Sequence, residues 1–520
     1  MIPHPAWTPH AMSATRLLAL SVLTCAQASA AVALASPFTD HAVLQREQPV
    51  PVWGTEDPGK TVTVSIQGLK ATAVATAEGK WKAVLPALPV GGPYDLTVAG
   101  SSTIVLKDIL VGEVWLCSGQ SNMEWTVKKS DHGDAEVAKA ANPRIRLFNV
   151  SAKRKGSNTP LDKVDAVWTE CTPMTVQNFS GVGYFFGREL EKELHVPIGL
   201  ISSSWGGTAA QVWISQPALE ASAEFKSQLT FWENDLLVHP QKMAEYKSVI
   251  LPKWEKDNAE AKVAGKPEIR KPREPNGPNT LERRPAGLYN GMIAPLVPYA
   301  LRGAIWYQGE ANANYPVPYR RLLPIMINDW RSAFAQEFSF YQVQLANFAK
   351  DDPAALTKPW PVINWPILRE SQAVVAATMP KAGMALAIDI GNPADIHPTN
   401  KQEVGRRLAL NALAKDYGKA VEFSGPAFKG MTVNNGKAVI TFDHAEGLAA
   451  KDGALKAFLI AGEDGLFVPA TAEIVDQTVE VSSPTVATPV AVRYNWANSP
   501  DGNLVNKAGL PAVPFRFPAK

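Results

Sequence analysis

The chain has 520 residues, and its 51 Lys and Arg nearly balance its 49 Asp and Glu, giving a formal net charge of +2. Hydrophobic residues make up 46% and charged residues 19%, which allows a large packed core and argues against wholesale disorder. Because no long basic run is present, neither nucleic acid nor an anionic membrane surface is an expected partner.

The N-terminus has the pattern of a secretory signal peptide, which we place at residues 1–35. An apolar run over 17–23 follows Arg16, and small residues then dominate 26–35. Both 28–30 and 33–35 fit an A-x-A cleavage signal. An uncleaved anchor helix is the alternative, but the apolar run is short for a membrane span. We therefore expect a secreted or periplasmic protein without an integral membrane span in the mature chain.

Two of the three cysteines, Cys117 and Cys171, lie beyond this leader. An exported protein can join such a pair in one disulfide. We instead expect two buried thiols, because Cys117 lies in an apolar stretch. No C-x-x-C motif occurs, so nothing in the sequence supports a zinc ribbon or another structural metal site.

Residues 36–110 are predicted to form an N-terminal β-sandwich. Apolar and polar residues alternate over 62–66, 73–76 and 81–85, and turn residues separate these runs. The segment 54–61 matches the phosphate-binding pattern G-x-x-x-x-G-K-[ST]. That loop functions between a strand and a helix, whereas a second strand pattern follows here, so we predict a turn and no bound nucleotide.

Residues 111–418 are predicted to form an α/β core. Short apolar strands alternate with amphipathic helices, which implies a mostly parallel sheet covered by helices on both faces. Ligands of such sheets bind beyond the carboxyl ends of the strands. An insertion at about 219–285 interrupts the core and forms either a solvated surface or a flap over the site. Strand patterns return in the C-terminal β-rich module at 419–520. The predicted core strands are 114–117, 198–201, 304–307, 340–345 and 384–388, and the predicted helices include 318–334, 366–378 and 401–417.

Ser121 follows the first core strand and is the candidate nucleophile. A serine at the carboxyl end of a parallel strand lies at the binding edge of the sheet. If a helix begins near Asn122, its free N–H groups face the serine oxygen and can stabilise an oxyanion. The alternative is that Ser121 only caps this helix.

A serine nucleophile needs a general base, and His397 is the best placed of the eight histidines. Most of the others fall in the leader, the flanking β-rich modules or the insertion. His397 lies in a loop that leaves an apolar strand and enters a helix, so it should share the sheet edge with Ser121. Asp395, two residues earlier, can accept a hydrogen bond from the imidazole and stabilise its charged form.

Five ordered blocks resemble the sialate O-acetylesterase family, which belongs to the SGNH (GDSL-like) hydrolases. The resemblance covers 111–418 and the flanking modules. It implies a flavodoxin-like three-layer α/β/α core flanked by β-sandwich-like modules, and an acyl-enzyme mechanism without metal or cofactor. The blocks are Ser-Gly-Gln-Ser-Asn-Met (118–123), Ser-Trp-Gly-Gly-Thr (204–208), Leu-Tyr-Asn-Gly-Met-Ile-Ala-Pro-Leu (288–296), Trp-Tyr-Gln-Gly-Glu-Ala-Asn (306–312) and Asp-Ile-His-Pro (395–398), followed by Lys401.

The resemblance also implies roles for further residues. The oxyanion donors would be the Ser121 N–H, the Gly207 N–H in preference to that of Gly206, and the Gln308 amide, with Asn312 as its alternative. The wider superfamily places its acid three residues before the histidine rather than two, which makes Asp389 a rival to Asp395. Asn122, Glu310 and Asn312 are candidate substrate-binding residues, although Glu310 would alternatively brace its loop.

The predicted substrate is therefore an acetylated sugar or glycan. Acetylated sialic acid and acetylated xylan are both consistent with the sequence, and sialate would require a cation for its carboxylate, which the sequence does not identify. A non-catalytic glycan-binding protein is the second hypothesis. A peptidase or lipase is the third, and it lacks the expected Gly-x-Ser-x-Gly motif at Ser121.

Overall fold

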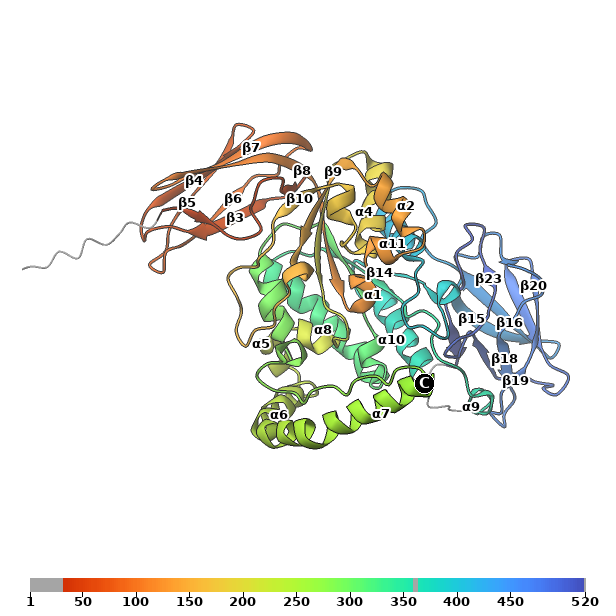
Figure 1. Cartoon of the computed structure of the whole chain (residues 1–520). Helices are drawn as coiled ribbons and strands as arrows, with labels where there is room; N and C mark the ends of the chain where they lie inside the picture. Colours follow the sequence, from red (N-terminus) through yellow and green to blue (C-terminus); the bar gives the residue numbers. More distant parts are fainter. Residues whose placement is uncertain (1–30, 359–362, 519–520) are drawn as a thin grey trace, which may run out of the picture.

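A computed structural model describes residues 31–358 and 363–518 of the chain. Residues 1–30 of the predicted signal peptide lie outside the described residues. Figure 1 shows three regions in chain order: a group of N-terminal strands, a central α/β body and a group of C-terminal strands.

The central sheet has the strand order β10-β9-β11-β8-β12-β13-β14. All neighbours along this path run parallel except β10, which is antiparallel to β9. The predicted mostly parallel sheet is thereby confirmed. The strands are β8 (Thr103–Gly119), β9 (Asn142–Asn149), β10 (Trp168–Cys171), β11 (Ile198–Ser204), β12 (Gly303–Tyr307), β13 (Ser339–Val343) and β14 (Ala382–Ala385).

Helices cover both faces of this sheet. Helices α4 (Gly181–Leu194) and α11 (Lys401–Lys415) pack together on one face, where Trp115 of β8 contacts Phe186 with ring centroids 4.9 Å apart. Helices α8 (Pro316–Phe334) and α10 (Asn364–Thr378) pack together on the other, where Trp306 of β12 contacts Trp330 at 5.8 Å. These contacts bury the aromatic residues and confirm the three-layer α/β/α core.

Strand β8 joins the N-terminal strands to the core without a break. Its first half pairs with β7 (Gly91–Ala99), and its second half pairs with β11 and β12. Exposed and partly buried residues alternate up to residue 108, after which every residue is buried. This change is expected where a strand passes from a sheet with one solvated face to a sheet covered on both faces. A boundary at residue 110 therefore falls inside a single strand.

The flanking regions are built mainly from antiparallel strands, and β2 (Val43–Gln45) is the exception because it pairs parallel with β8. Segment 54–61 is a turn that leads into a strand, as predicted. The C-terminal strands form two four-stranded sheets that share one apolar core. The N-terminal strands are β1 (Ala33–Leu34), β2 (Val43–Gln45), β3 (Val50–Thr55), β4 (Thr61–Ile66), β5 (Leu69–Val74), β6 (Lys80–Leu85) and β7. The two C-terminal sheets contain β15 (Ala427–Asn434), β16 (Lys437–Asp443), β18 (Phe458–Ala461), β19 (Val468–Pro469), β20 (Thr471–Val475), β21 (Thr478–Ser482), β22 (Ala491–Tyr494) and β24 (Phe515–Phe517), and β17 (Ala449–Ala450) pairs with β23 (Leu504–Val505).

The insertion is largely helical. Helix α5 (Gln216–Glu220) precedes α6 (Lys226–Glu245), which continues through a π-helical turn (Tyr246–Ile250) into α7 (Leu251–Val263). In Figure 1, α6 and α7 lie along the lower end of the central body, towards which β8 runs into α1 (Ser121–Glu124). The shorter helices are α2 (Gly133–Lys139), α3 (Pro173–Val176) and α9 (Pro353–Leu356).

Two further predictions concern the thiols and the membrane. Cys117 and Cys171 are free and buried, as expected, and burial raises the pKa of both thiols. Within 31–358 and 363–518, no helix is both long and apolar enough to cross a bilayer.

Candidate active site

The structure brings Ser121 and His397 together. His397 Nε2 lies 2.9 Å from Ser121 Oγ, a hydrogen-bonding distance between residues 276 positions apart in the chain. This distance suits proton transfer from a serine hydroxyl to an imidazole.

Ser121 is the first residue of α1, directly beyond the carboxyl end of β8. Gly119 has a φ of 139°, and a Cβ placed on it would lie 2.2 Å from the carbonyl oxygen of Tyr307. Only glycine therefore allows β8 to turn this close to β12. The N–H groups of Ser121 and Asn122 belong to the first turn of α1 and have no partner inside the helix. Both are therefore candidate oxyanion donors, and the Ser121 N–H is the one that the family resemblance implies.

Asp395 lies beside His397, but the contact is loose. Its Oδ1 is 3.4 Å from His397 Nδ1 and accepts the backbone N–H of His397 at 2.9 Å. The Asp395 side chain remains 56% exposed. The rival Asp389 is engaged elsewhere, since both of its oxygens bind the guanidinium of Arg407 at 2.6 and 2.8 Å. The structure therefore places Asp395, not Asp389, next to the imidazole.

Trp125 holds the other side of the imidazole. Its ring stacks on His397 with centroids 5.3 Å apart and an interplanar angle of 18°. Ser121, Trp125 and His397 line a pocket of about 360 Å³. Asn149 also lines this pocket, and its buried Oδ1 has no hydrogen-bond partner among the described residues. Asn149 therefore offers an acceptor to a bound hydroxyl group.

The side chain of Asn122 is buried and forms hydrogen bonds with three other segments of the chain. Its Nδ2 donates to Glu310 Oε1 at 2.6 Å and to the backbone oxygen of Ile396 at 3.0 Å. Its Oδ1 accepts from Lys401 Nζ at 2.5 Å. Because Asn122 is only 1% exposed, it and Glu310 brace the loop that carries His397. A contact between the Asn122 side chain and the substrate is not supported, whereas the alternative loop-bracing role of Glu310 fits these contacts.

Buried charges set the ionisation of this network. Burial lowers the pKa of Lys401 to about 7, although the charges of Glu310 and Asp395 oppose this shift. Burial raises the pKa of Glu310, against the hydrogen bond from Asn122 and the Lys401 charge. Partial burial lowers the pKa of His397, Lys401 and Lys129 lower it further, and Asp395 opposes them. A lowered pKa keeps the imidazole neutral, which is the form that accepts a proton.

The two glycines of the Ser-Trp-Gly-Gly-Thr block take different places. A Cβ on Gly206 would lie 3.2 Å from Ser121 Cβ, so it is Gly206 that packs against the serine. Its N–H, however, donates to Glu124 Oε2 at 2.6 Å. Gly207 has a φ of 74°, and its N–H has no acceptor among the described residues. Gly207 therefore remains the glycine of this pair with a free donor.

Gln308 has a different role from the one predicted. Its Nε2 donates to the backbone oxygen of Thr208 at 3.2 Å and to Asn312 Oδ1 at 2.7 Å. Both amide hydrogens are thus engaged within the core, and none is left for an oxyanion. The alternative, Asn312, donates to Gln211 Oε1 at 3.2 Å and keeps its second amide hydrogen.

Several residues at the site were not singled out from the sequence. Glu124 forms an ion pair with Arg154 as well as binding Gly206. Both Glu124 and Trp125 directly follow the Ser-Gly-Gln-Ser-Asn-Met block at 118–123, which is the signal that could have identified them. Arg273 of the insertion has no such signal. Its Nη2 lies 3.6 Å from a Cβ placed on Gly207, and it has no ion-pair partner in the described parts of the chain.

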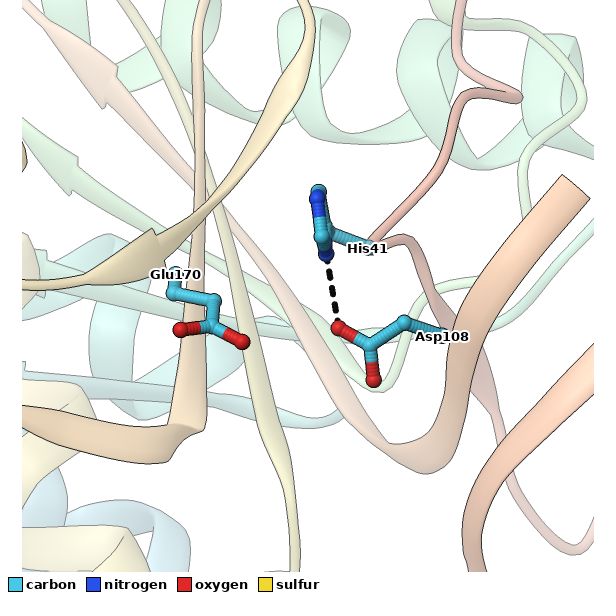
Figure 2. A group of neighbouring side chains, drawn as sticks. All are labelled: His41, Asp108 and Glu170. Carbon is cyan, nitrogen blue, oxygen red and sulfur yellow. Dashed lines mark hydrogen bonds and ion pairs between the residues drawn. The ribbon is translucent and has the colours of Figure 1, made fainter.

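One group of potential metal ligands lies away from this site, at the junction of the N-terminal strands and the core. Figure 2 shows His41, Asp108 and Glu170 facing one another. His41 Nδ1 lies 2.6 Å from Asp108 Oδ2. Arg146, which is 3% exposed, forms ion pairs with both Asp108 and Glu170. Because this guanidinium already supplies the compensating charge, the group is better explained as an ion-pair network that joins the two regions.

Comparisons with known proteins identify the family of the chain. Residues 111–257 match a family model described as "Carbohydrate esterase, sialic acid-specific acetylesterase". The sialate O-acetylesterase of Mus musculus is 33% identical over 509 residues, covering 90% of each chain. That of Homo sapiens is 30% identical over 545 residues, covering 96% of this chain and 95% of its own.

A solved structure extends the similarity to the whole fold. The crystal structure of a carbohydrate acetylesterase from Xanthomonas citri aligns with a TM-score of 0.78 and 38% identity. The alignment covers 94% of this chain and 100% of that chain. With relatives of this identity over nearly its whole length, the chain belongs to the sialate O-acetylesterase family.

Proposed function

We propose that the protein is a serine esterase that hydrolyses O-acetyl esters on carbohydrates through an acetyl-Ser121 intermediate. The observation that carries this proposal is the hydrogen bond between Ser121 Oγ and His397 Nε2 at 2.9 Å. Membership of the family supports the same reaction, since its relatives are sialate O-acetylesterases.

In the proposed mechanism, Ser121 Oγ attacks the acetyl carbonyl carbon while His397 Nε2 takes the hydroxyl proton. The N–H groups of Ser121, Asn122 and Gly207 are candidates to stabilise the oxyanion. The imidazolium then protonates the departing sugar oxygen, which breaks the ester bond and leaves acetyl on Ser121. A water molecule, deprotonated by His397, attacks this intermediate, and acetate leaves as the serine regains its proton.

The direct test is hydrolysis of p-nitrophenyl acetate and acetate release from acetylated sugars. Replacing Ser121 by Ala removes the nucleophile, so activity should fall by about 10³-fold or more. A folded Ser121→Ala variant that retains the wild-type rate would contradict the mechanism. Thermal unfolding of both proteins controls for loss of fold.

We further propose that the preferred substrate is an acetylated sialic acid. The supporting feature is Arg273, an exposed and unpaired cation beside Gly207, whose neighbour Gly206 packs on Ser121. A guanidinium binds a carboxylate through two parallel hydrogen bonds, and acetylated xylan offers no such carboxylate. Hydrolysis of acetylated xylan, as by an acetylxylan esterase, remains the competing function.

A substrate panel separates these two functions. Wild-type kcat/KM is compared for 9-O-acetyl sialate and for acetylated xylo-oligomers, together with an Arg273→Gln variant. The sialate proposal predicts that the variant loses about tenfold on sialate and little on the neutral sugar. An equal effect on both sugars, or a wild-type preference for acetylated xylan, would contradict it. We also propose that the enzyme is exported, on the evidence of the leader pattern alone.

A further inference from the structure

A second pocket lies between the insertion and helix α8. Its volume is about 520 Å³, and small-ligand sites typically measure about 300–1,000 Å³. It shares no lining residue with the pocket at Ser121. We call it the α6–α8 groove, because its lining residues include several from α6 and several from α8. Its lining includes Gln211, Gln228, Phe231, Trp232, Asn312 and Tyr315.

Exposed aromatic rings stand on two sides of this groove. Phe231 of α6 is 66% exposed, and Tyr315, which immediately precedes α8, is 69% exposed. Trp232 also lines the groove and is 5% exposed. Large exposed aromatic side chains gathered at one pocket indicate a binding surface. Their flat faces suit a ligand that has an apolar face of its own.

The groove also offers an unused hydrogen-bond acceptor. Gln228 Oε1 is buried and has no partner among the described residues. Buried polar atoms are nearly always satisfied, so this oxygen would gain a partner if the Gln228 side chain turned towards a hydroxyl group in the groove. A ring with both an apolar face and hydroxyl donors matches the two features together, and a sugar residue has this chemistry.

Two segments connect the groove to the nucleophile. Gln211 and Asn312 face each other across its inner wall and are hydrogen-bonded at 3.2 Å. Gln211 lies a few residues after Gly206, which packs on Ser121. Asn312 directly follows Ala311, whose N–H donates to Gln120 Oε1 at 3.2 Å. These two segments link the inner wall of the groove to the residues around Ser121, and the proposal places the remainder of a bound glycan along them.

We propose that the α6–α8 groove binds a second sugar residue of the substrate, so that the enzyme prefers an acetylated sugar within an oligosaccharide to the free acetylated sugar. This inference rests on the proposed esterase function. It assigns the insertion a part in substrate recognition, beyond the solvated surface or flap expected from its sequence.

The test compares one acetylated sugar in its free and linked forms. Two pairs serve as probes: 9-O-acetyl sialate with its lactose conjugate, and monoacetylated xylose with monoacetylated xylotriose. The better-hydrolysed pair is used to measure kcat/KM for the wild type, Phe231→Ala and Tyr315→Ala. Leu237→Ala is the matched control, because Leu237 is 79% exposed on the same helix but does not line the groove.

The wild type should hydrolyse the linked sugar about tenfold more efficiently than the free one. Each groove variant should lose most of that preference, by about three- to tenfold, while its rates on the free sugar and on p-nitrophenyl acetate stay unchanged. Leu237→Ala should behave like the wild type. A wild type without preference for the linked sugar, or variants equally impaired on both forms, would overturn the inference. If the wild type fails to hydrolyse p-nitrophenyl acetate and both sugars, the esterase proposal itself is wrong.

Discussion

Replacing Asp395 by Asn tests how strongly the carboxylate supports His397. In the structure the two side chains are 3.4 Å apart, and the carboxylate is 56% exposed. At this separation, and with an effective dielectric constant of about 40–80 for a solvated pair, the interaction between carboxylate and imidazolium is about 1–2.5 kcal/mol. Removing it should therefore lower kcat/KM by about 5- to 70-fold. Loss of a buried aspartate from a serine protease triad costs about 10⁴-fold.

The pH dependence gives this prediction a sign. His397 accepts a proton only when neutral, so kcat/KM rises as the pH increases through the pKa of His397. Asp395 raises that pKa, against burial and the charges of Lys401 and Lys129. In the Asp395→Asn variant, the rise of kcat/KM with pH, which is the acidic limb of the profile, should therefore occur at a lower pH than in the wild type. Burial already lowers the pKa of His397 in the wild type, so its acidic limb should lie below the ordinary pKa of histidine.

The assay is the pH profile of kcat/KM on an acetylated sugar, whose leaving oxygen needs a proton from His397. Asp389→Asn is the control, because Asp389 binds Arg407 instead of His397 and should leave the profile in place. A loss near 10⁴-fold would show that Asp395 acts as a tightly coupled triad member, and a loss below about twofold would show that it does not support His397. Either result would refute the reasoning from distance and exposure.

Three further predictions follow from other contacts. Lys401→Met should raise the pKa of His397, because the charge of Lys401 lowers that pKa. The acidic limb of kcat/KM should therefore move to higher pH, as measured in the pH profile on an acetylated sugar. Gly206→Ala places a Cβ 3.2 Å from Ser121 Cβ, so kcat should fall by about 10- to 100-fold at an unchanged melting temperature, measured by acetate release and calorimetry. Leader cleavage should follow Ala30 rather than Ala35, because β1 pairs with β3 and Val32 is 4% exposed, and mass spectrometry of the mature N-terminus would check this.

The periodicity of the sequence predicted five of the seven strands of the central sheet and the helices that cover it, but it missed β9 and β10. The predicted helix at 318–334 corresponds to α8, and the predicted strand at 304–307 to β12, because both are amphipathic or apolar runs of ordinary length. The same reasoning misplaced the end of the N-terminal strands. Strand β8 changes from alternating to continuous burial at residue 109, and a local pattern shows this change as an apparent break between two elements.

Side-chain roles were harder to predict, because they depend on contacts between distant segments. Ser121 and His397 were identified since both lie at strand ends, and the topology of a parallel sheet brings such ends together. Gln308 was chosen as an oxyanion donor for its chemical type alone. Its direction depends on Thr208, which is 100 residues away in the chain, and no local pattern specifies that contact.

Lys401 shows most clearly what the sequence pattern omits. A lysine at the first position of a helix ordinarily extends into solvent, yet Lys401 is fully buried and contacts Asn122 at 2.5 Å. A buried amine is costly unless other groups satisfy it, and here Asn122 accepts a hydrogen bond from it while Glu310 lies nearby. Asn122 links Lys401 to Glu310 and to the backbone of Ile396, the residue before His397. One amide thus connects the turn that carries the nucleophile to the loop that carries the base, and its hydrogen bonds to Glu310 and Lys401 hold that amide in a single orientation.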